Sequence, residues 1–147
     1  MSSPIVFSRS FRVYYEHTDA GGVVYHANYL NFMAQTRTEF LRELGVELVQ
    51  LEREVGVLFA VRSVSVDYRR PARLDDLIQV SLGLGEIRPA SLTFEQRIDR
   101  EGETLCSGEV RVASLSSDRF RPVPLPDGLQ GLLEEVVRSG MPGHRKG

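Results

Sequence analysis

One long amphipathic stretch decides the fold. Residues 28–45 read NYLNFMAQTRTEFLRELG, in which large apolar side chains recur every three or four positions. This spacing gathers them on one face of an α-helix. The face comprises Leu30, Met33, Arg37, Phe40, Leu41 and Leu44. With Asn28 as a suitable N-cap and Gly45 as a suitable stop, the sequence predicts a helix from about Asn28 to Leu44.

The sequence on both sides of this helix alternates in polarity, as half-buried strands do. A first strand is predicted at residues 11–16, ahead of the helix. After the helix we expect a short helical piece at 46–54, strands at 58–68, 76–84, 91–99 and 105–116, and a C-terminal helix at 128–138. Turns are expected at 86–89 and 100–103, so the strands after Pro71 should be antiparallel neighbours.

The order of these elements favours an α+β fold, with a single helix of about four turns laid on a curved antiparallel sheet. The length of 147 residues fits one domain, which we expect to span residues 1–138. Residues 139–147 are rich in glycine and charge. They are expected to form a disordered tail, in which His144 has no role.

The composition is that of a soluble globular protein, with 41% hydrophobic and 26% charged residues. The formal net charge of −2 gives no reason to expect nucleic acid or an anionic membrane as a partner. The sequence contains neither the apolar core of a signal peptide nor a run long enough to span a bilayer. Cys106 is the only cysteine, which fits a reducing compartment, and we expect a cytoplasmic protein with Cys106 buried in its sheet.

The stretch most informative about function runs into the helix. Residues 12–29 read RVYYEHTDAGGVVYHANY. Asp19 is followed by Gly21 and Gly22, and glycines allow a positive φ and a close approach of the backbone to a ligand. By itself, an aspartate ahead of glycines is most often a turn residue. A carboxylate on such a turn can also act as a nucleophile or a general base, so both interpretations stand.

This stretch resembles the signature of the hydroxybenzoyl-CoA thioesterase family, and within it the YbgC type of bacterial acyl-CoA thioesterase. Residues 37–39 and 67–76 resemble the same group, so the resemblance extends from about Phe11 to Pro124. It implies a hotdog fold, in which a curved antiparallel sheet of about five strands wraps the long helix. It also implies a thioester hydrolase that cleaves acyl-CoA to a free acid and CoA.

The resemblance assigns roles to several residues of this stretch. Asp19 is expected to be the catalytic carboxylate, with Tyr15 to orient it and His26 to position water or to donate to the leaving sulfur. Backbone N–H groups of Tyr25 and His26, at the start of the helix, are expected to polarise the thioester carbonyl. Gly22 and Val24 are expected to contact the substrate.

Coenzyme A is polyanionic, so cations are expected to contact its phosphates. The candidates are Arg69, Arg70, Arg73 and Arg88, because the arginine fork fits phosphate well, although ordinary surface charge is a competing interpretation. No cofactor is implied beyond the CoA of the substrate. The three histidines are scattered without metal-ligand spacing, so no metal site is expected.

Two other residues are open to more than one interpretation. His17 departs from the YbgC type, which often carries an acidic residue at this position, and the change puts the acidic surroundings of Asp19 in doubt. Glu39 could be a second catalytic carboxylate, as in another branch of hotdog thioesterases. With Arg37 and Arg42 near it on the helix, an ion pair is the favoured interpretation.

Two other functions remain as alternatives. The chain could bind acyl-CoA or acyl carrier protein as a scaffold without turnover, although a pure binder gains nothing from a carboxylate beside the thioester. A hotdog hydratase or dehydratase would need a histidine-bearing motif on a different element, and the sequence contains none. For the enzyme we expect a homodimer or homotetramer, because a single sheet leaves open edges.

Overall fold

The computed structural model describes residues 3–142. A five-stranded sheet and three α-helices make up the fold. The elements in chain order are β1 (Phe7–Arg12), the 3₁₀ turn η1 (Tyr15–His17), α1 (His26–Glu43), α2 (Leu48–Val55), β2 (Val57–Tyr68), β3 (Leu77–Arg88), β4 (Ser91–Arg100), β5 (Glu103–Ser116) and α3 (Leu129–Ser139).

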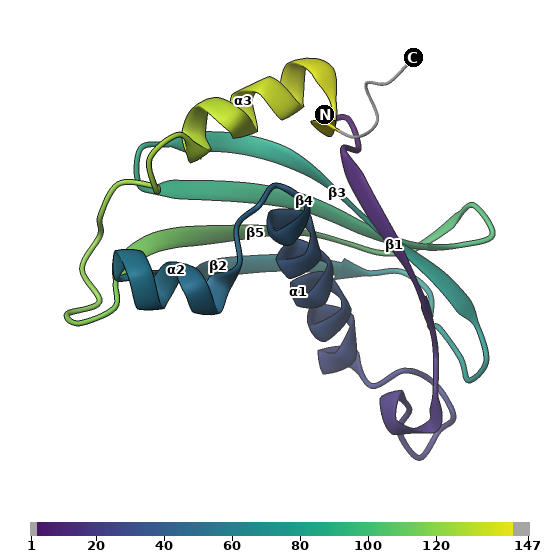
Figure 1. Ribbon diagram of the computed structural model, residues 1–147. Helices are drawn as coiled ribbons and strands as arrows, with labels where there is room; N and C mark the ends of the chain where they lie inside the picture. The colour runs from purple at the N-terminus through teal and green to yellow at the C-terminus, as the bar shows by residue number, and fades with distance from the viewer. Residues whose placement is uncertain (1–2, 143–147) are drawn as a thin grey trace.

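The sheet has the order β1-β3-β4-β5-β2, and all of its pairings are antiparallel. It curves around α1, which lies across one of its faces, while α3 packs on β3 and α2 lies beside β2 (Figure 1). This arrangement is the hotdog fold, so the predicted fold class is confirmed. The strands after Pro71 are consecutive antiparallel neighbours, as their short connections predicted.

The core consists of two apolar clusters between the sheet and the helices, one of which also includes residues of α3. A short hydrogen-bond network between α1 and β4 lies beside these clusters. The Gln96 amide donates to the Met33 carbonyl (3.0 Å) and accepts from the Arg37 guanidinium (2.9 Å). Burial lowers the pKa of Arg37 to about 10. Buried polar groups need such partners, and this network fixes the centre of α1 on the sheet.

The structure corrects the predicted start of α1 and its buried face. The helix begins at His26 with Tyr25 as its N-cap, so Asn28 lies inside the first turn and is not the cap. The buried face consists of Tyr29, Phe32, Met33, Thr36, Phe40 and Leu41. The expected face was therefore rotated slightly toward Leu30 and Leu44, because a period of three or four residues does not fix the rotation of a helix.

The first strand was predicted too far along the chain. β1 ends at Arg12, and Tyr15 lies in a 3₁₀ turn with 80% of its surface exposed. A run of alternating aromatic and polar residues favours a strand, but here the backbone turns toward the loop that carries Asp19. The turn expected at 86–89 is also shorter, because β3 continues to Arg88.

The C-terminal segment is ordered further than predicted. Ser139 belongs to α3, and Met141 is 2% exposed within the apolar cluster that α3 covers. The rest of the expected tail, residues 143–147 with His144, lies outside the described residues.

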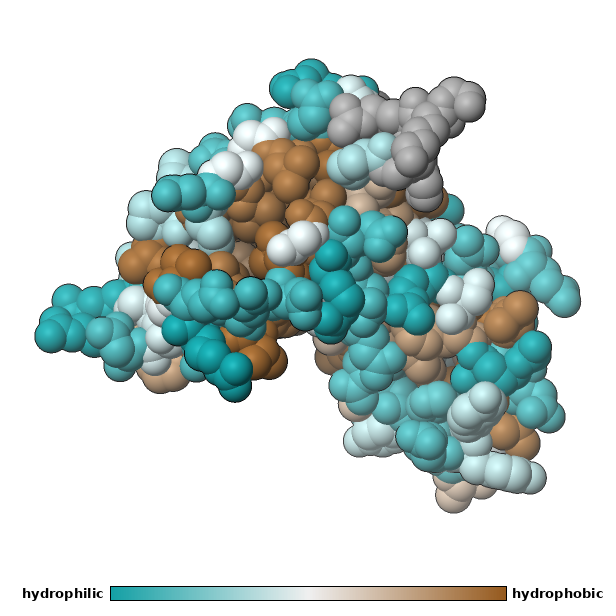
Figure 2. Space-filling view, in the orientation of Figure 1, coloured by the Kyte–Doolittle hydropathy of each residue, from teal (hydrophilic) through white to brown (hydrophobic). Residues whose placement is uncertain are grey.

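The surface differs between the two ends of the molecule. Apolar side chains show between α2 and α3, whereas the end that carries η1 and the start of α1 is mostly polar (Figure 2). The edge strand β2 also exposes Val61, Val64 and Tyr68 at 51%, 44% and 45%. Within residues 3–142, no helix is both long and apolar enough to cross a bilayer.

Candidate active site

Asp19 lies on a tight loop ahead of α1. Its carboxylate Oδ1 accepts a hydrogen bond from the Gly21 N–H (2.8 Å), and its carbonyl accepts one from the Gly22 N–H (3.1 Å). Gly22 has a φ of 80°, which glycine adopts without strain. The Asp19 N–H donates to the Val23 carbonyl (2.9 Å) and closes the loop. Asp19 is exposed, so its carboxylate faces outward from a rigid turn.

Backbone pairing holds this loop against the start of α1. Thr18 and Val24 form a β-bridge, and the next residue, Tyr25, donates its N–H to the His17 carbonyl (2.9 Å). The Val24 N–H donates to the Ala72 carbonyl (2.8 Å), which ties the same segment to the loop that follows β2. The loop with Asp19 and the N-terminus of α1 therefore form one unit.

The N-terminus of α1 offers free backbone donors. The amides of His26 and Ala27 have no acceptor among residues 3–142, whereas the Asn28 amide is bonded to the Tyr25 carbonyl (2.8 Å). The helix dipole of 18 residues adds partial positive charge at this end. The expectation that the Tyr25 amide polarises a carbonyl is wrong for this arrangement, because that N–H is bonded to His17.

A pocket of about 260 Å³ opens beside this helix end. Its lining comprises His26, Tyr29, Tyr68, Arg69, Arg70 and Pro71. The structure thus brings together three residues that the sequence nominated separately: His26, Arg69 and Arg70. Asp19 and Tyr15 lie outside the lining of this pocket in the single chain.

Two tyrosines of this pocket were missed by the sequence analysis. The Tyr68 hydroxyl donates to the His26 carbonyl (3.1 Å), and the Tyr29 hydroxyl accepts the Ala72 N–H (2.9 Å). Burial raises the pKa of Tyr29. These bonds join the start of α1 to the end of β2 and to the loop that follows it, across more than 40 residues. No local pattern could have signalled them, although Tyr68 lies in the stretch of family resemblance.

The two pocket arginines are held by nearby carboxylates. Arg69 pairs with Asp67 (3.0 Å) and Arg70 pairs with Glu103 (2.9 Å). All four side chains are largely exposed, so these pairs are weak and a phosphate can compete with them.

Arg88 does not join this cluster in the single chain. It pairs with Glu86 (3.0 Å) at the far end of the sheet. Following the register along β4, the row of Arg88 and the row of Tyr68 are seven residues apart, or about 23 Å. One chain therefore cannot bring Arg88 and Arg70 to the same phosphate.

The remaining predicted residues have clear positions. Val24 is 4% exposed within the core, so the expected substrate contact has no surface from which to be made. The phenol of Tyr15 has no hydrogen bond to Asp19, and its carbonyl accepts the Thr18 hydroxyl and N–H. Cys106 is buried, as predicted, and burial raises the pKa of its thiol to about 12.

Glu39 forms the predicted ion pair, although with one partner that the sequence did not indicate. It pairs with Arg42 and also with Arg9 of β1, both at 3.4 Å. Arg37 bonds to Gln96 instead. A carboxylate that bridges α1 to β1 in this way is best explained as a structural group.

Comparison with known proteins decides the family. Residues 13–133, most of the chain, match the profile of the thioesterase-like superfamily. This chain belongs to the thioesterase-like superfamily. The family resemblance inferred from residues 12–29 is thereby confirmed.

Relatives within the thioesterase-like superfamily include two YbgC proteins. "Acyl-CoA thioesterase YbgC" of Haemophilus influenzae is 43% identical over 120 residues, covering 82% of this chain and 88% of its own. "Acyl-CoA thioester hydrolase YbgC" of Escherichia coli is 41% identical over 127 residues, covering 84% and 92%. The predicted YbgC type of thioester hydrolase is therefore confirmed.

Solved structures of thioesterases share the fold. The 1,4-dihydroxy-2-naphthoyl-CoA thioesterase Slr0204 from Synechocystis superposes with a TM-score of 0.78 at 18% identity, covering 89% of this chain and 93% of its own. At that identity the likeness establishes the hotdog fold alone.

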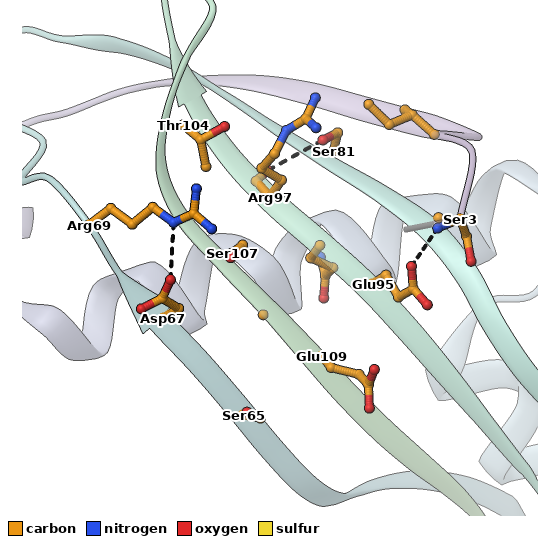
Figure 3. A pocket seen from close by; sticks show the side chains of 14 residues that line it. Ser3, Ser65, Asp67, Arg69, Ser81, Glu95, Arg97, Thr104, Ser107 and Glu109 are labelled. Atoms are coloured by element: carbon orange, nitrogen blue, oxygen red, sulfur yellow. Dashed lines mark hydrogen bonds and ion pairs between the residues drawn. The ribbon is translucent and has the colours of Figure 1, made fainter. Parts of the chain in front are cut away.

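This thioesterase-like chain has a second, larger hollow on the opposite face of the sheet, with a volume of about 550 Å³. Figure 3 shows Asp67 and Arg69 facing one another there, with the backbone of Ser3 beside Glu95. The Ser3 N–H donates to Glu95 at 2.6 Å. The lining contains carboxylates but no helix N-terminus, so it lacks the free backbone donors that stabilise the oxyanion of a reacting thioester.

Proposed function

We propose that this protein hydrolyses the thioester of an acyl-CoA to a free acid and CoA, with Asp19 as the catalytic carboxylate. The proposal rests on one observation above all. The free N–H groups of His26 and Ala27, at the positive end of α1, lie in the same backbone unit as the loop that carries Asp19. Donors of this kind stabilise the oxyanion that forms when a thioester carbonyl is attacked.

Two routes of attack are compatible with this arrangement. Asp19 can attack the acyl carbon directly, so that the C–S bond breaks and CoA leaves as a thiolate that takes up a proton. Water then hydrolyses the mixed anhydride and regenerates the carboxylate. Alternatively, Asp19 takes a proton from a water molecule that attacks the same carbon. Both routes use the same oxyanion donors.

The pocket beside α1 supports a binding role for its charged residues. His26 is exposed at the pocket wall, where its imidazole can position water or donate to the leaving sulfur. Arg69 and Arg70 lie on the same wall, so they are suited to the phosphates of CoA. Tyr15 and Gly22 flank the Asp19 loop and are proposed to contact the substrate from that side.

The active unit is proposed to be a homodimer or homotetramer. β2 is an edge strand of 12 residues with exposed valines, which favours continuation of the sheet into a second copy. Asp19, Tyr15 and His26 are all exposed in the single chain, so a second copy can enclose them and exclude water. Light scattering tests this, and a monomer would count against it.

The cellular setting is a smaller part of the proposal. A single cysteine fits a reducing compartment, which supports activity in the cytoplasm. Acyl carrier protein is a second candidate donor of the acyl group, because it carries the same kind of thioester.

The decisive experiment measures release of free thiol from short, long and aromatic acyl-CoAs by wild type and Asp19→Asn. We expect turnover by the wild type and a loss of about a hundredfold or more in the variant. The substrate that reacts fastest identifies the acyl class. A wild type that binds acyl-CoA without releasing thiol would overturn the catalytic proposal and favour a scaffold.

A further inference from the structure

Tyr29 has a hydroxyl group whose own proton is unused. The residue is 4% exposed, and its hydroxyl oxygen accepts the backbone N–H of Ala72 at 2.9 Å. A phenol has one proton to donate in addition to the lone pairs with which it accepts. Among residues 3–142, the Tyr29 hydroxyl donates no hydrogen bond in return. Buried polar groups normally have partners, so this proton is available to an acceptor from outside the chain.

Two contacts fix the direction of the Tyr29 side chain. The bond from the buried Ala72 N–H holds its hydroxyl from one side. Its ring meets the ring of Tyr68 edge-on, with the centroids 5.4 Å apart, and Tyr68 in turn donates to the His26 carbonyl. Burial raises the pKa of the Tyr29 phenol, so the hydroxyl keeps its proton at neutral pH. Tyr29 therefore provides a neutral donor in a fixed position.

This donor belongs to the pocket beside the start of α1, which Tyr29 lines. His26 and Tyr29 are three residues apart on α1, so their side chains lie on the same face of the helix, about 4.5 Å apart along its axis. Arg69 and Arg70 line the same pocket from the segment that follows β2. A ligand in this pocket can therefore contact the helix end, the Tyr29 hydroxyl and two cations.

An acyl-CoA has a suitable acceptor close to its reacting carbon. Its pantetheine arm begins at the sulfur with an ethylene group, and an amide follows whose carbonyl oxygen accepts hydrogen bonds. With the thioester carbonyl at the free N–H groups of His26 and Ala27, this arm has to run toward the arginines proposed for the phosphates. Tyr29 lines the pocket that contains both ends of this course. The amide carbonyl nearest the sulfur is therefore the acceptor expected for its hydroxyl.

We propose that Tyr29 is a substrate-binding residue that recognises the pantetheine arm of acyl-CoA, by donating its hydroxyl proton to the amide carbonyl nearest the sulfur. This inference rests on the proposed function of the pocket. The contact is made to the arm and not to the acyl group, so it is the same for every acyl chain. A site with a donor in place discriminates against a ligand that lacks the acceptor, so thioesters without this amide are poor substrates.

Two small thioesters isolate this contact in the wild type. The N-acetylcysteamine thioester carries the amide of the arm and no phosphate, whereas the S-pentyl thioester of the same acid has the same length and no amide. We expect kcat/KM to be about fivefold higher for the amide-bearing thioester, the effect of one hydrogen bond. Equal values for the two thioesters would overturn the inference, and this comparison needs no variant.

Tyr29→Phe removes the donor and keeps the ring. It also removes the acceptor of the Ala72 N–H, so it is assayed at a temperature where urea unfolding shows it to be folded. We expect the ratio of the two kcat/KM values to fall to about one in this variant. Tyr68→Phe is the matched control and should keep the wild-type ratio, because the Tyr68 hydroxyl already donates to the His26 carbonyl. An equal loss on both thioesters in Tyr29→Phe would indicate a packing role and contradict the proposal.

Binding without turnover separates this inference from the proposed function. S-hexyl-CoA is a thioether that a thioesterase does not hydrolyse, and calorimetry measures its Kd. Tyr29→Phe is expected to raise this Kd about fivefold, and Tyr68→Phe to change it less. If the Kd rises in this way but no acyl-CoA is hydrolysed, recognition by Tyr29 stands and the proposed function fails. If hydrolysis depends on Asp19 while the Kd is unchanged in Tyr29→Phe, the proposed function stands and this inference fails.

Discussion

Two of the hollows among residues 3–142 differ in the groups that line them, and one of the two lies beside the proposed reaction site. The hollow on the open face of the sheet is about twice as large as the pocket at the start of α1, with about 550 against about 260 Å³. It also contains more charged groups, such as Arg97, which pairs with Asp99. Arg69, which pairs with Asp67, lines both hollows, so ion pairing does not distinguish them. The smaller pocket adjoins unbonded N–H groups at a helix end.

The difference follows from how each surface is built. The open face consists of strand residues that alternate with core residues, so it gathers side chains such as Ser65, Ser81 and Ser107 that are small and polar. Its backbone donors are already used in the sheet. A helix N-terminus leaves donors unused by its geometry, whatever the sequence. Unsatisfied backbone donors, rather than volume or charge, therefore distinguish the proposed reaction site from the open face.

The largest expected effect tests this comparison with one chemical change made in each region. Asp19→Asn should lower kcat/KM by at least about a hundredfold, because it removes the proposed nucleophile or base. Glu109→Gln, the same change on the open face, should leave kcat/KM unchanged, since Glu109 lines the larger hollow. Thiol release under subsaturating substrate measures both. An equal loss in the two variants would place the chemistry elsewhere.

A smaller loss is expected from the side chain at the helix end. His26→Ala should lower kcat/KM about tenfold, which corresponds to one lost hydrogen bond to water or to the leaving sulfur. Gln35→Ala, an exposed change further along α1, should have no effect and controls for altered helix stability. Single-turnover thiol release separates this step from binding. Full activity in His26→Ala would restrict the role of α1 to its backbone.

The arginines that line the smaller pocket should affect substrate binding more than turnover. Arg70→Gln is expected to raise KM for acyl-CoA up to about fivefold, with kcat unchanged and with the difference reduced at high salt. Arg97→Gln on the open face should leave KM unchanged, although Arg97 is equally involved in an ion pair. Steady-state kinetics at two salt concentrations provide the test. The same rise in both variants would indicate a general electrostatic effect.

Those elements that depend on local periodicity could be predicted from the sequence. The long helix and the four strands after it have strong periods, and all of them form close to their expected positions. The first strand failed because residues 13–17 contain strand-favouring aromatics but turn at Tyr15, where the side chain of His17 caps the backbone. A bond from a side chain to the backbone is not visible in a pattern of polarity.

Single residues of the candidate site could be predicted from the sequence, but the contacts between distant segments could not. Asp19 and His26 came from one continuous motif, and the structure keeps them in one unit. The bond from Tyr68 to His26 joins residues 42 positions apart, and the separation of Arg88 from Arg70 depends on the register of three strand pairs. Both facts are set by the tertiary fold, so no local pattern could supply them.

The smallest effect on activity is expected from Gly83→Ala on the open face, although this change should clearly lower stability. Gly83 lies on the open face under the N-terminal segment, and a Cβ there would lie 2.5 Å from the Pro4 carbonyl oxygen. Gly83→Ala must displace residues 3–5 or β3, which should lower the free energy of unfolding by about 1–3 kcal/mol. Gly131→Ala in α3 meets no atom within 4 Å and should raise it by up to about 1 kcal/mol, because alanine favours helix.

Urea unfolding measures both changes, and thiol release measures their effect on activity. We expect Gly83→Ala to keep kcat/KM unchanged at a temperature where it is fully folded, because the open face lies outside the proposed reaction site. A loss of activity in folded Gly83→Ala would mean that the two faces communicate through β3 and β4. The division of the molecule into a structural face and a reactive helix end would then be wrong.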